Sequence, residues 1–217
     1  MGVPEVPIWA LTHLTHASLQ RTAEQRSIDL LHIKGPATRL SLRDGWHDSS
    51  DADVLVRPAH QDRFLKALVE DGWTLFSGFD ENAPFEYAAN FTHPSWTYAD
   101  VHRQLSGPRA TPEAVFERLW RDHETADIGH HPCPVPSVSG QILVQTLHIA
   151  RSHDPERAEA WALSTPELRD AALVLAHELD ADEAFVAGIG DLDAPSSGAS
   201  SRWDSMPQDP RHGRGGS

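Results

Sequence analysis

The sequence of 217 residues predicts an α+β protein with a small, mixed but mostly antiparallel sheet, flanking helices and a helical second half. Three observations support this fold class. Short apolar runs that suit strands alternate with helical patterns up to about residue 107. Beyond that point the apolar spacing is mainly helical. The chain is also long enough for one good-sized domain, or two small ones, with ample core.

The first half is expected to hold two amphipathic helices and several short strands. Apolar residues recur at helical spacing in 8–26 and 59–71, and Gly72 suits the end of the second helix. Pro36 fits the first turn of a further helix through Leu42, because the missing N–H of proline has no helical partner there anyway. Strands are predicted at 27–33, 51–57, 73–76 and 95–105, with 77–92 as a loop.

The second half is predicted to be helical, apart from a loop over 129–136. Its longest helix opens at Ser137, a residue type that caps helix N-termini well. The expected helices are 112–121, 137–152, 156–162, 166–179 and 182–187. We therefore divide the chain into an α/β domain (1–107), a helical half (108–190) and a Gly-, Ser- and Pro-rich tail (191–217) that is expected to be disordered.

Composition narrows the class of partner. The formal charge of −14 argues against a large nucleic-acid interface, which needs a basic surface to displace counterions. No basic and apolar leader opens the sequence, and no apolar run approaches the ~20 residues of a membrane span. The single cysteine, Cys133, excludes an internal disulfide and fits a reducing compartment. We expect a cytoplasmic protein that is not bound to a membrane.

The most informative segment is Asp51-Ala52-Asp53, which stands at the head of the apolar run Val54 to Val56. In a strand, Asp51 and Asp53 point to the same face. Two like charges at ~4 Å repel by roughly 4 kcal/mol at an effective dielectric constant of 20. A divalent cation would relieve this repulsion, and carboxylate oxygens on a rigid strand suit Mg²⁺. The alternative is a pair of solvated turn residues before a strand.

Three segments together resemble a bacterial nucleotidyltransferase family of the DNA-polymerase-β superfamily. The segments are Leu31-His32-Ile33-Lys34-Gly35-Pro36-Ala37, Ser50-Asp51-Ala52-Asp53-Val54-Leu55-Val56 and Ala99-Asp100-Val101-His102. They match a family pattern of Lys-Gly-x-Ala, then Asp-h-Asp-h-h-Val, then Asp-h-His, where h is an apolar residue. The similarity extends over about residues 11–151. Any one of the segments alone would be a weak signal.

The resemblance implies a metal-dependent transfer reaction. Asp51 and Asp53 would hold one or two Mg²⁺ ions bound to a nucleoside triphosphate, and Asp100 would complete the carboxylate cluster. Asp100 would also be best placed to help deprotonate a hydroxyl acceptor, either as a base or as a metal ligand. The product would be an acceptor carrying a nucleoside monophosphate, with release of pyrophosphate. The negative charge of the chain favours a small molecule, peptide or protein as acceptor.

The same resemblance implies contacts to the triphosphate. Amides after Gly35 would meet phosphate at a helix N-terminus, Lys34 would add a positive charge and Thr38 a hydroxyl. His102 lies two residues after Asp100, so it would share the face of that strand and could line the site or be a half-buried strand residue. Pro36 removes one amide donor, and the family's usual arginine before Asp51 is missing.

Three alternatives remain open at this stage. The departures from the family pattern would suit a nucleotide-binding or regulatory module that has lost catalysis. A kinase could use the same carboxylates. Fourteen histidines also raise the question of zinc, but the groups around His130, His131 and Cys133 and around His148 lack the Cys/His spacing of known zinc sites. His148 and Arg151 are instead expected to point from the helical half toward the nucleotide or acceptor.

Overall fold

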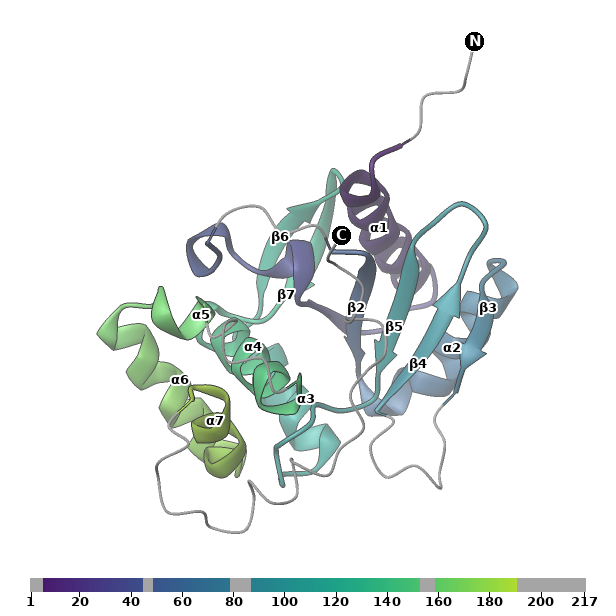
Figure 1. Cartoon of the computed structure of the whole chain (residues 1–217). Coiled ribbons are helices and arrows are strands. Elements are labelled where there is room, and N and C mark those ends of the chain that lie inside the picture. Colours follow the sequence, from purple (N-terminus) through teal and green to yellow (C-terminus); the bar gives the residue numbers. More distant parts are fainter. Residues whose placement is uncertain (1–5, 45–48, 79–86, 153–158, 191–217) are drawn as a thin grey trace.

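The computed structural model describes residues 6–44, 49–78, 87–152 and 159–190, and it confirms the predicted fold class. The predicted tail, 191–217, lies outside the described residues. A five-stranded mixed sheet is followed by a mainly helical part (Figure 1). In the part of the chain that is described, no helix has the length and apolar character needed to cross a bilayer.

The sheet has the strand order β1-β2-β5-β4-β3, and only β2 and β5 run parallel. Its strand β4 lies in the segment 77–92, so the prediction of a loop over that whole segment is wrong. The strand is only five residues long and includes two alanines and an asparagine, so the sequence gives little periodicity to detect it. The bounds are β1 (Leu30–Ile33), β2 (Asp51–Val56), β3 (Thr74–Ser77), β4 (Ala88–Thr92) and β5 (Tyr98–His102).

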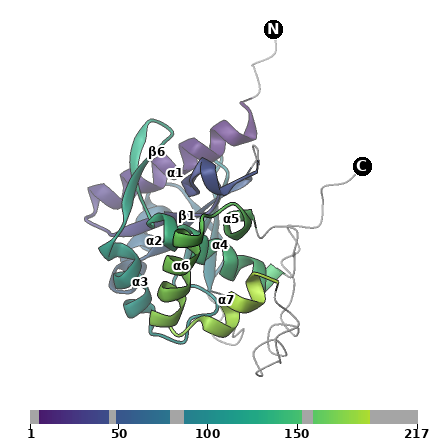
Figure 2. The same cartoon turned by 90° about the vertical axis from the view of Figure 1, so that its left-hand side faces the viewer.

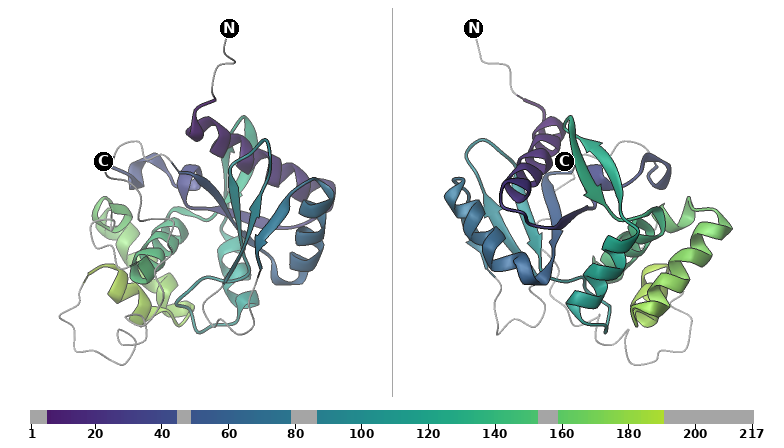
Figure 3. Two further views of the ribbon diagram at one scale, coloured as in Figure 1. Left: turned by 45° about the vertical axis from the view of Figure 1, so that its right-hand side comes forward. Right: turned by 180° about the vertical axis from the view of Figure 1, so that it is seen from behind.

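Helices pack on both faces of this sheet. Helices α1 (Ile8–Gln25) and α2 (Gln61–Glu70) cover one face (Figure 3). The alternate β2 residues Val54 and Val56 are buried against these helices. The helices of the second half lie on the other side of the sheet (Figure 2). Leu55 packs in a cluster formed mainly by residues of that half. The period-2 alternation of strand side chains thus sends one set of apolar residues into each core.

The described residues of the second half form five helices and a hairpin. The elements are α3 (Pro112–Arg121), β6 (Glu124–Ile128), β7 (His131–Val135), α4 (Val138–Ser152), α5 (Glu159–Ala162), α6 (Pro166–Glu178) and α7 (Asp182–Gly188). Thr111 and Thr165 cap α3 and α6, because each side-chain oxygen accepts a hydrogen bond from the amide three residues later. The helices predicted for this half are present, with ends that shift by a few residues; the start of the one predicted at 156 lies outside the described residues.

The β6–β7 hairpin replaces the loop predicted over 129–136. Gly129 and His130 both have positive φ, 63° and 61°, as a two-residue turn of the hairpin type requires. Pro132 and Pro134 disfavour a strand, but among the described residues β7 pairs on one edge only, where proline is tolerated. The turn lies against α1: a Cβ on Gly129 would come within 2.7 Å of the His13 carbonyl oxygen.

The prediction of a helix after Pro36 is also wrong. The chain forms two separate 3₁₀ turns instead, Gly35–Ala37 and Leu40–Leu42. Extended backbone at Thr38 and Arg39 separates the turns. Each turn buries one apolar residue, Ala37 in the first and Leu42 in the second, so these residues do not form one helical face.

A chain of buried polar side chains joins α1 to the sheet. His16 Nδ1 lies 2.8 Å from His32 Nδ1, and His32 Nε2 lies 3.1 Å from the Gln20 side-chain oxygen. Because that oxygen only accepts, His32 carries its proton on Nε2, and His16 donates from Nδ1. His16 Nε2 is then a buried acceptor without a hydrogen-bond partner. Burial lowers the pKa of His16 to about 4, chiefly through desolvation of the charged form.

We expect this pair to make the fold sensitive to acid. The pKa of His16 is lower in the folded protein than its ordinary 6.5, so the unfolded chain binds protons more readily. The contribution of neutral His16 to the free energy of unfolding is therefore fully present above about pH 6.5. It falls by about 3 kcal/mol as the pH drops toward 4. The measurement is urea unfolding of the wild type and of His16→Gln between pH 8 and 4. The stability difference between the two proteins isolates this residue from other titrating groups, and a difference independent of pH would contradict the expectation.

The contact between α7 and α4 leaves no space for a side chain. A Cβ on Gly188 would lie 2.1 Å from the carbonyl oxygen of Thr146, which is backbone and cannot rotate away. We expect Gly188→Ala to lower the free energy of unfolding by about 3 kcal/mol, measured by denaturant unfolding. Gly78→Ala is the control, because a Cβ there meets nothing closer than 3.7 Å. Equal effects in the two variants would refute the close approach of the helices.

Candidate active site

Two predicted carboxylates meet across the centre of the sheet. Asp53 of β2 and Asp100 of β5 are direct partners in the parallel register, so their side chains project to the same face. Both residues are only 4% exposed. The sequence placed them 47 positions apart without showing that their strands are neighbours; the structure brings them together. His102, two residues further along β5, joins them: one ligand atom from each of the three side chains lies within 4.8 Å of the others.

Asp51 adds a third negative group on the same face of β2. The Ser49 hydroxyl lies 3.2 Å from its carboxylate and 2.9 Å from its carbonyl oxygen. Burial raises the pKa of Asp51 to about 7, and the charges of Asp53 and Asp100 raise it further than Lys34 and Ser49 lower it. The site thus holds more negative charge than its own cations neutralise. We call Asp51, Asp53 and Asp100 the carboxylate cluster.

Lys34 and His102 converge on a single oxygen of Asp53. The Lys34 ammonium lies 2.5 Å and His102 Nε2 lies 2.7 Å from Asp53 Oδ1. Burial alone would raise the pKa of Asp53, but Lys34 and His102 outweigh it and hold that pKa well below its usual range. Because the ionised carboxylate only accepts, His102 must carry a proton on Nε2. The same pairing outweighs the desolvation of Lys34 and raises its pKa.

The Lys34-Gly35 turn is held tightly against the start of β2. Lys34 and Gly35 have φ angles of 61° and 46°, and a Cβ on Gly35 would approach Ser49 Oγ to 2.9 Å. The amides of Ala37 and Thr38 donate to the carbonyls of Lys34 and Gly35 inside the 3₁₀ turn. Pro36 has no N–H at all. The helix N-terminus expected here is therefore not formed, and two of the amides after Gly35 are already engaged.

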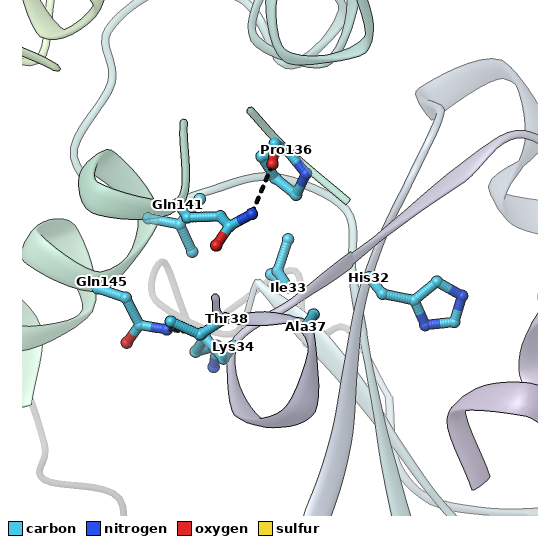
Figure 4. A pocket seen from close by; sticks show the side chains of 9 residues that line it. His32, Ile33, Lys34, Ala37, Thr38, Pro136, Gln141 and Gln145 are labelled. Carbon is cyan, nitrogen blue, oxygen red and sulfur yellow. Dashed lines mark hydrogen bonds between the residues drawn. The ribbon is translucent and has the colours of Figure 1, made fainter. Parts of the chain in front are cut away.

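Thr38 is positioned by α4 rather than by a phosphate-binding helix. It is 4% exposed, and its hydroxyl oxygen accepts a hydrogen bond of 2.7 Å from Gln145. Gln141 accepts from the Arg39 amide at 2.7 Å and donates to the Pro136 carbonyl at 2.8 Å. Figure 4 shows Gln141 and Gln145 reaching from α4 toward the turn that carries Thr38. Sequence reasoning missed both glutamines, which follow no motif and act through the tertiary contact alone.

A pocket opens beside the carboxylate cluster, between the sheet and α4. Its polar wall consists of Lys34, His102, Gln104, Ser106, His148 and Arg151. We call it the His102 pocket. His148 and Arg151 were expected from the sequence to face the site, and both line this pocket. Ser106 was not expected; its hydroxyl is buried and has no hydrogen-bond partner.

Among the described residues, the group of His130, His131 and Cys133 does not form a comparable cluster. Within the described ranges, Asp53, Asp100 and His102 are the only three ligating side chains near enough to share an ion. Cys133 is fully buried in the β6–β7 hairpin, and burial raises the pKa of its thiol to about 12. His131 lies 3.2 Å from the Glu24 carboxylate.

Comparison with known proteins agrees with this geometry. A family model described as uncharacterised nucleotidyltransferase matches residues 11–187. The chain belongs to that nucleotidyltransferase family. The resemblance inferred from Lys34-Gly35, Asp51-Ala52-Asp53 and Asp100-Val101-His102 is thereby confirmed at the level of the family. No curated protein matches the chain.

Solved structures of several nucleotidyltransferases are distantly similar in fold. The lincosamide antibiotic adenylyltransferase LnuA, solved with lincomycin, is 14% identical, with a TM-score of 0.47 over 70% of this chain and 96% of that one. ANT(2″)-Ia in complex with adenylyl-2″-tobramycin is 13% identical, with a TM-score of 0.46 over 82% and 94%. An antigenic nucleotidyltransferase-like protein from Paracoccidioides brasiliensis is 15% identical, with a TM-score of 0.44 over 82% and 93%.

Two matched substitutions should have opposite effects on the stability of this nucleotidyltransferase. Asp51→Asn removes a charge that burial and the neighbouring carboxylates both disfavour, so it should raise the free energy of unfolding at pH 8 by about 2 kcal/mol. Asp53→Asn leaves the Lys34 ammonium buried without its carboxylate and should lower it by about 3 kcal/mol. Denaturant unfolding at pH 8 without divalent ions measures both. Destabilisation by Asp51→Asn would show that its negative charge is already neutralised in the folded protein.

Proposed function

We propose that this protein is a Mg²⁺-dependent nucleotidyltransferase that moves a nucleoside monophosphate from a nucleoside triphosphate to a hydroxyl acceptor. The observation that carries the proposal is the pairing of Asp53 with Asp100 in adjacent strands, with Asp51 on the same face. Membership of a nucleotidyltransferase family supports the reaction class.

The carboxylate cluster fits a divalent cation. Three carboxylates face one ammonium. Burial raises the pKa of Asp51 to about 7, and the charges of Asp53 and Asp100 add to that rise. Carboxylate oxygens are the ligands that Mg²⁺ prefers. Asp51, Asp53 and Asp100 would hold one or two ions. When bound, Mg²⁺ would act as a Lewis acid that stabilises charge on the phosphoryl oxygens and on the departing pyrophosphate.

The transfer is a nucleophilic substitution at the α-phosphorus. The acceptor oxygen forms a bond to the α-phosphorus, and the bond from that phosphorus to the oxygen bridging to the β-phosphate breaks. Pyrophosphate leaves with the bonding electron pair. We assign the proton of the acceptor hydroxyl to Asp100, which is buried on the strand that also leads into the His102 pocket.

The residues around the cluster orient the reacting groups. His102 donates to Asp53 and so fixes the direction of that carboxylate. We assign Lys34 and the Gly35 turn to the triphosphate, where the ammonium can shift between Asp53 and a phosphate oxygen. The Thr38 hydroxyl accepts from Gln145 and so keeps its own proton for a phosphate oxygen. The net charge of −14 favours a small molecule, peptide or protein over a nucleic acid as acceptor. We place the reaction in the cytoplasm.

Labelled nucleotides test the reaction. The protein is incubated with Mg²⁺, each of the four triphosphates and the small-molecule and protein fractions of a cell extract. We expect label from the α-phosphate on an acceptor, and its loss in Asp53→Asn and Asp100→Asn. Transfer of label from the γ-phosphate would identify a kinase instead. A catalytically inert module would give no transfer from either position.

A stability measurement tests the metal without depending on turnover. We expect millimolar Mg²⁺ to raise the melting temperature of the wild type by a few degrees, because an ion bound by the folded state alone stabilises it. Asp51→Asn should show a smaller rise, since it has lost both a ligand and a repelled charge. Equal rises in the two proteins would place the ion elsewhere. Calorimetry with Mg-ATP and Mg-GTP completes the test: no binding at millimolar levels would contradict the proposal.

A further inference from the structure

We propose that two buried threonines of α1, Thr12 and Thr15, are positioning residues that assemble the carboxylate cluster. Each of them ties α1 to the segment that enters one of the two strands bearing the carboxylates. We call this pair the threonine clamp. Its use in holding a divalent cation rests on the proposed function, whereas the clamp itself requires no ligand and no turnover.

Thr12 holds the entry to β2. Its hydroxyl lies 2.6 Å from the carbonyl oxygen of Ser49 and 3.0 Å from that of Ile8, four residues earlier in α1. Threonine inside a helix commonly bonds to the carbonyl four residues back, but the shorter of these two contacts reaches 37 positions along the chain. The Ser49 hydroxyl in turn donates to Asp51. Thr12 therefore acts on Asp51 through one intervening residue.

Thr15 holds the entry to β5. Its hydroxyl donates to the Leu11 carbonyl at 2.8 Å, and it accepts from the Thr97 amide at 3.1 Å and from the Thr97 hydroxyl at 3.0 Å. The hydroxyl of Thr15 thus uses its one proton and both lone pairs. Thr97 directly precedes β5, the strand that carries Asp100. A shift of this entry along the strand would therefore move Asp100 with it.

The parallel pairing of β2 with β5 needs such a device. A tight turn fixes the register of an antiparallel hairpin, but parallel strands need a long crossover, and here α2, β3 and β4 lie between β2 and β5 along the chain. Alternating apolar packing excludes a slip of one residue but allows a slip of two, which keeps every side chain on its face. Only the observed register places Asp53 beside Asp100. The clamp excludes both slips, because it fixes the two strand entries to one rigid helix.

The burial of the two threonines supports a specific role for their hydroxyls. Thr12 and Thr15 are both 0% exposed. They lie three residues apart on α1, so their side chains are neighbours on one helix face. A buried hydroxyl costs free energy unless it is hydrogen-bonded, and valine would fill nearly the same space without that cost. What threonine adds at these positions is the bonds to the strand entries.

Thr22 provides a matched control on the same helix. It is 4% exposed, and its hydroxyl donates to the Asp71 carboxylate at 2.6 Å, at the C-terminal end of α2. Thr22→Val therefore deletes a buried threonine hydroxyl of α1 without affecting the entries to β2 and β5. A bond to a charged acceptor contributes at least as much to stability as a bond to a neutral one. An effect that acts only through stability should thus be at least as large in Thr22→Val as in the clamp variants.

Manganese ion is the probe for the first measurement, because carboxylate sites that suit Mg²⁺ also suit Mn²⁺ and its binding can be followed by electron paramagnetic resonance. We expect Thr12→Val and Thr15→Val each to weaken Mn²⁺ binding about fivefold, the equivalent of one hydrogen bond. Thr22→Val should lower the melting temperature at least as much as either variant and leave Mn²⁺ binding unchanged. Thr12→Ser and Thr15→Ser keep the hydroxyl and should bind Mn²⁺ as the wild type does.

Amide hydrogen exchange without divalent ions measures the clamp itself. We expect faster exchange at the first amides of β2 in Thr12→Val and of β5 in Thr15→Val, because these strand ends open more often once released from α1. Thr22→Val should leave exchange at both strand ends unchanged. If Thr15→Val fails to fold, Thr97→Val removes one of the two bonds between these residues and is measured in its place.

Two results for Mn²⁺ would overturn the proposal. Equal losses of affinity in Thr22→Val and in the clamp variants would show an effect of stability alone, and unchanged binding in both clamp variants would show no effect at all. If the wild type binds no Mn²⁺ at millimolar concentration, the proposed function fails and the exchange rates decide on the clamp. Faster exchange confined to the clamp variants would then support it, and unchanged rates at the starts of β2 and β5 would overturn it.

Discussion

The parallel pairing of β2 with β5 is the constraint on which the candidate site depends. Asp53 and Asp100 are register partners, so a slip of one residue would turn one of the two carboxylates to the opposite face. The register is held by the alternation of buried residues: Val54, Val56 and Val101 fill the core under α1 and α2. Packing on one face of the sheet thus determines which charges meet on the other.

The Lys34–Asp53 ion pair links this sheet geometry to the loop that precedes β2. Lys34 adopts a positive φ of 61°, a conformation that is unfavourable for a residue with a side chain. The ion pair with the buried Asp53 carboxylate, whose direction His102 fixes, compensates for it. Removing Asp53 would therefore disturb the loop as well as the cluster. The Lys34–Asp53 ion pair and the backbone conformation at Lys34 therefore depend on each other.

The sequence predicted what depends on local pattern, and it failed where a tertiary contact decides. The Asp-x-Asp step and the helical apolar faces are local, and α1, α2, α3, α4 and α6 were recovered almost to their ends. The β6–β7 hairpin was missed because Pro132 and Pro134 oppose strand propensity, while one-sided pairing and contact with α1 override it. The sequence predicts a helix after Lys34, whereas the structure has two turns, because their anchoring by Gln141 and Gln145 depends on tertiary contacts that no local pattern shows. Ser106 belongs to no motif, and only its place beside His102 draws attention to it.

The buried thiol of Cys133 has a practical consequence. It is the single cysteine of the chain, it is fully enclosed, and burial raises its pKa to about 12, so thiolate is scarce in the folded state. An alkylating reagent added to the folded protein can react only after the hairpin separates from its surroundings. The rate of alkylation therefore reports how often this region opens, without any label having to be introduced. Cys133 is thus an intrinsic probe of the local opening of β6 and β7.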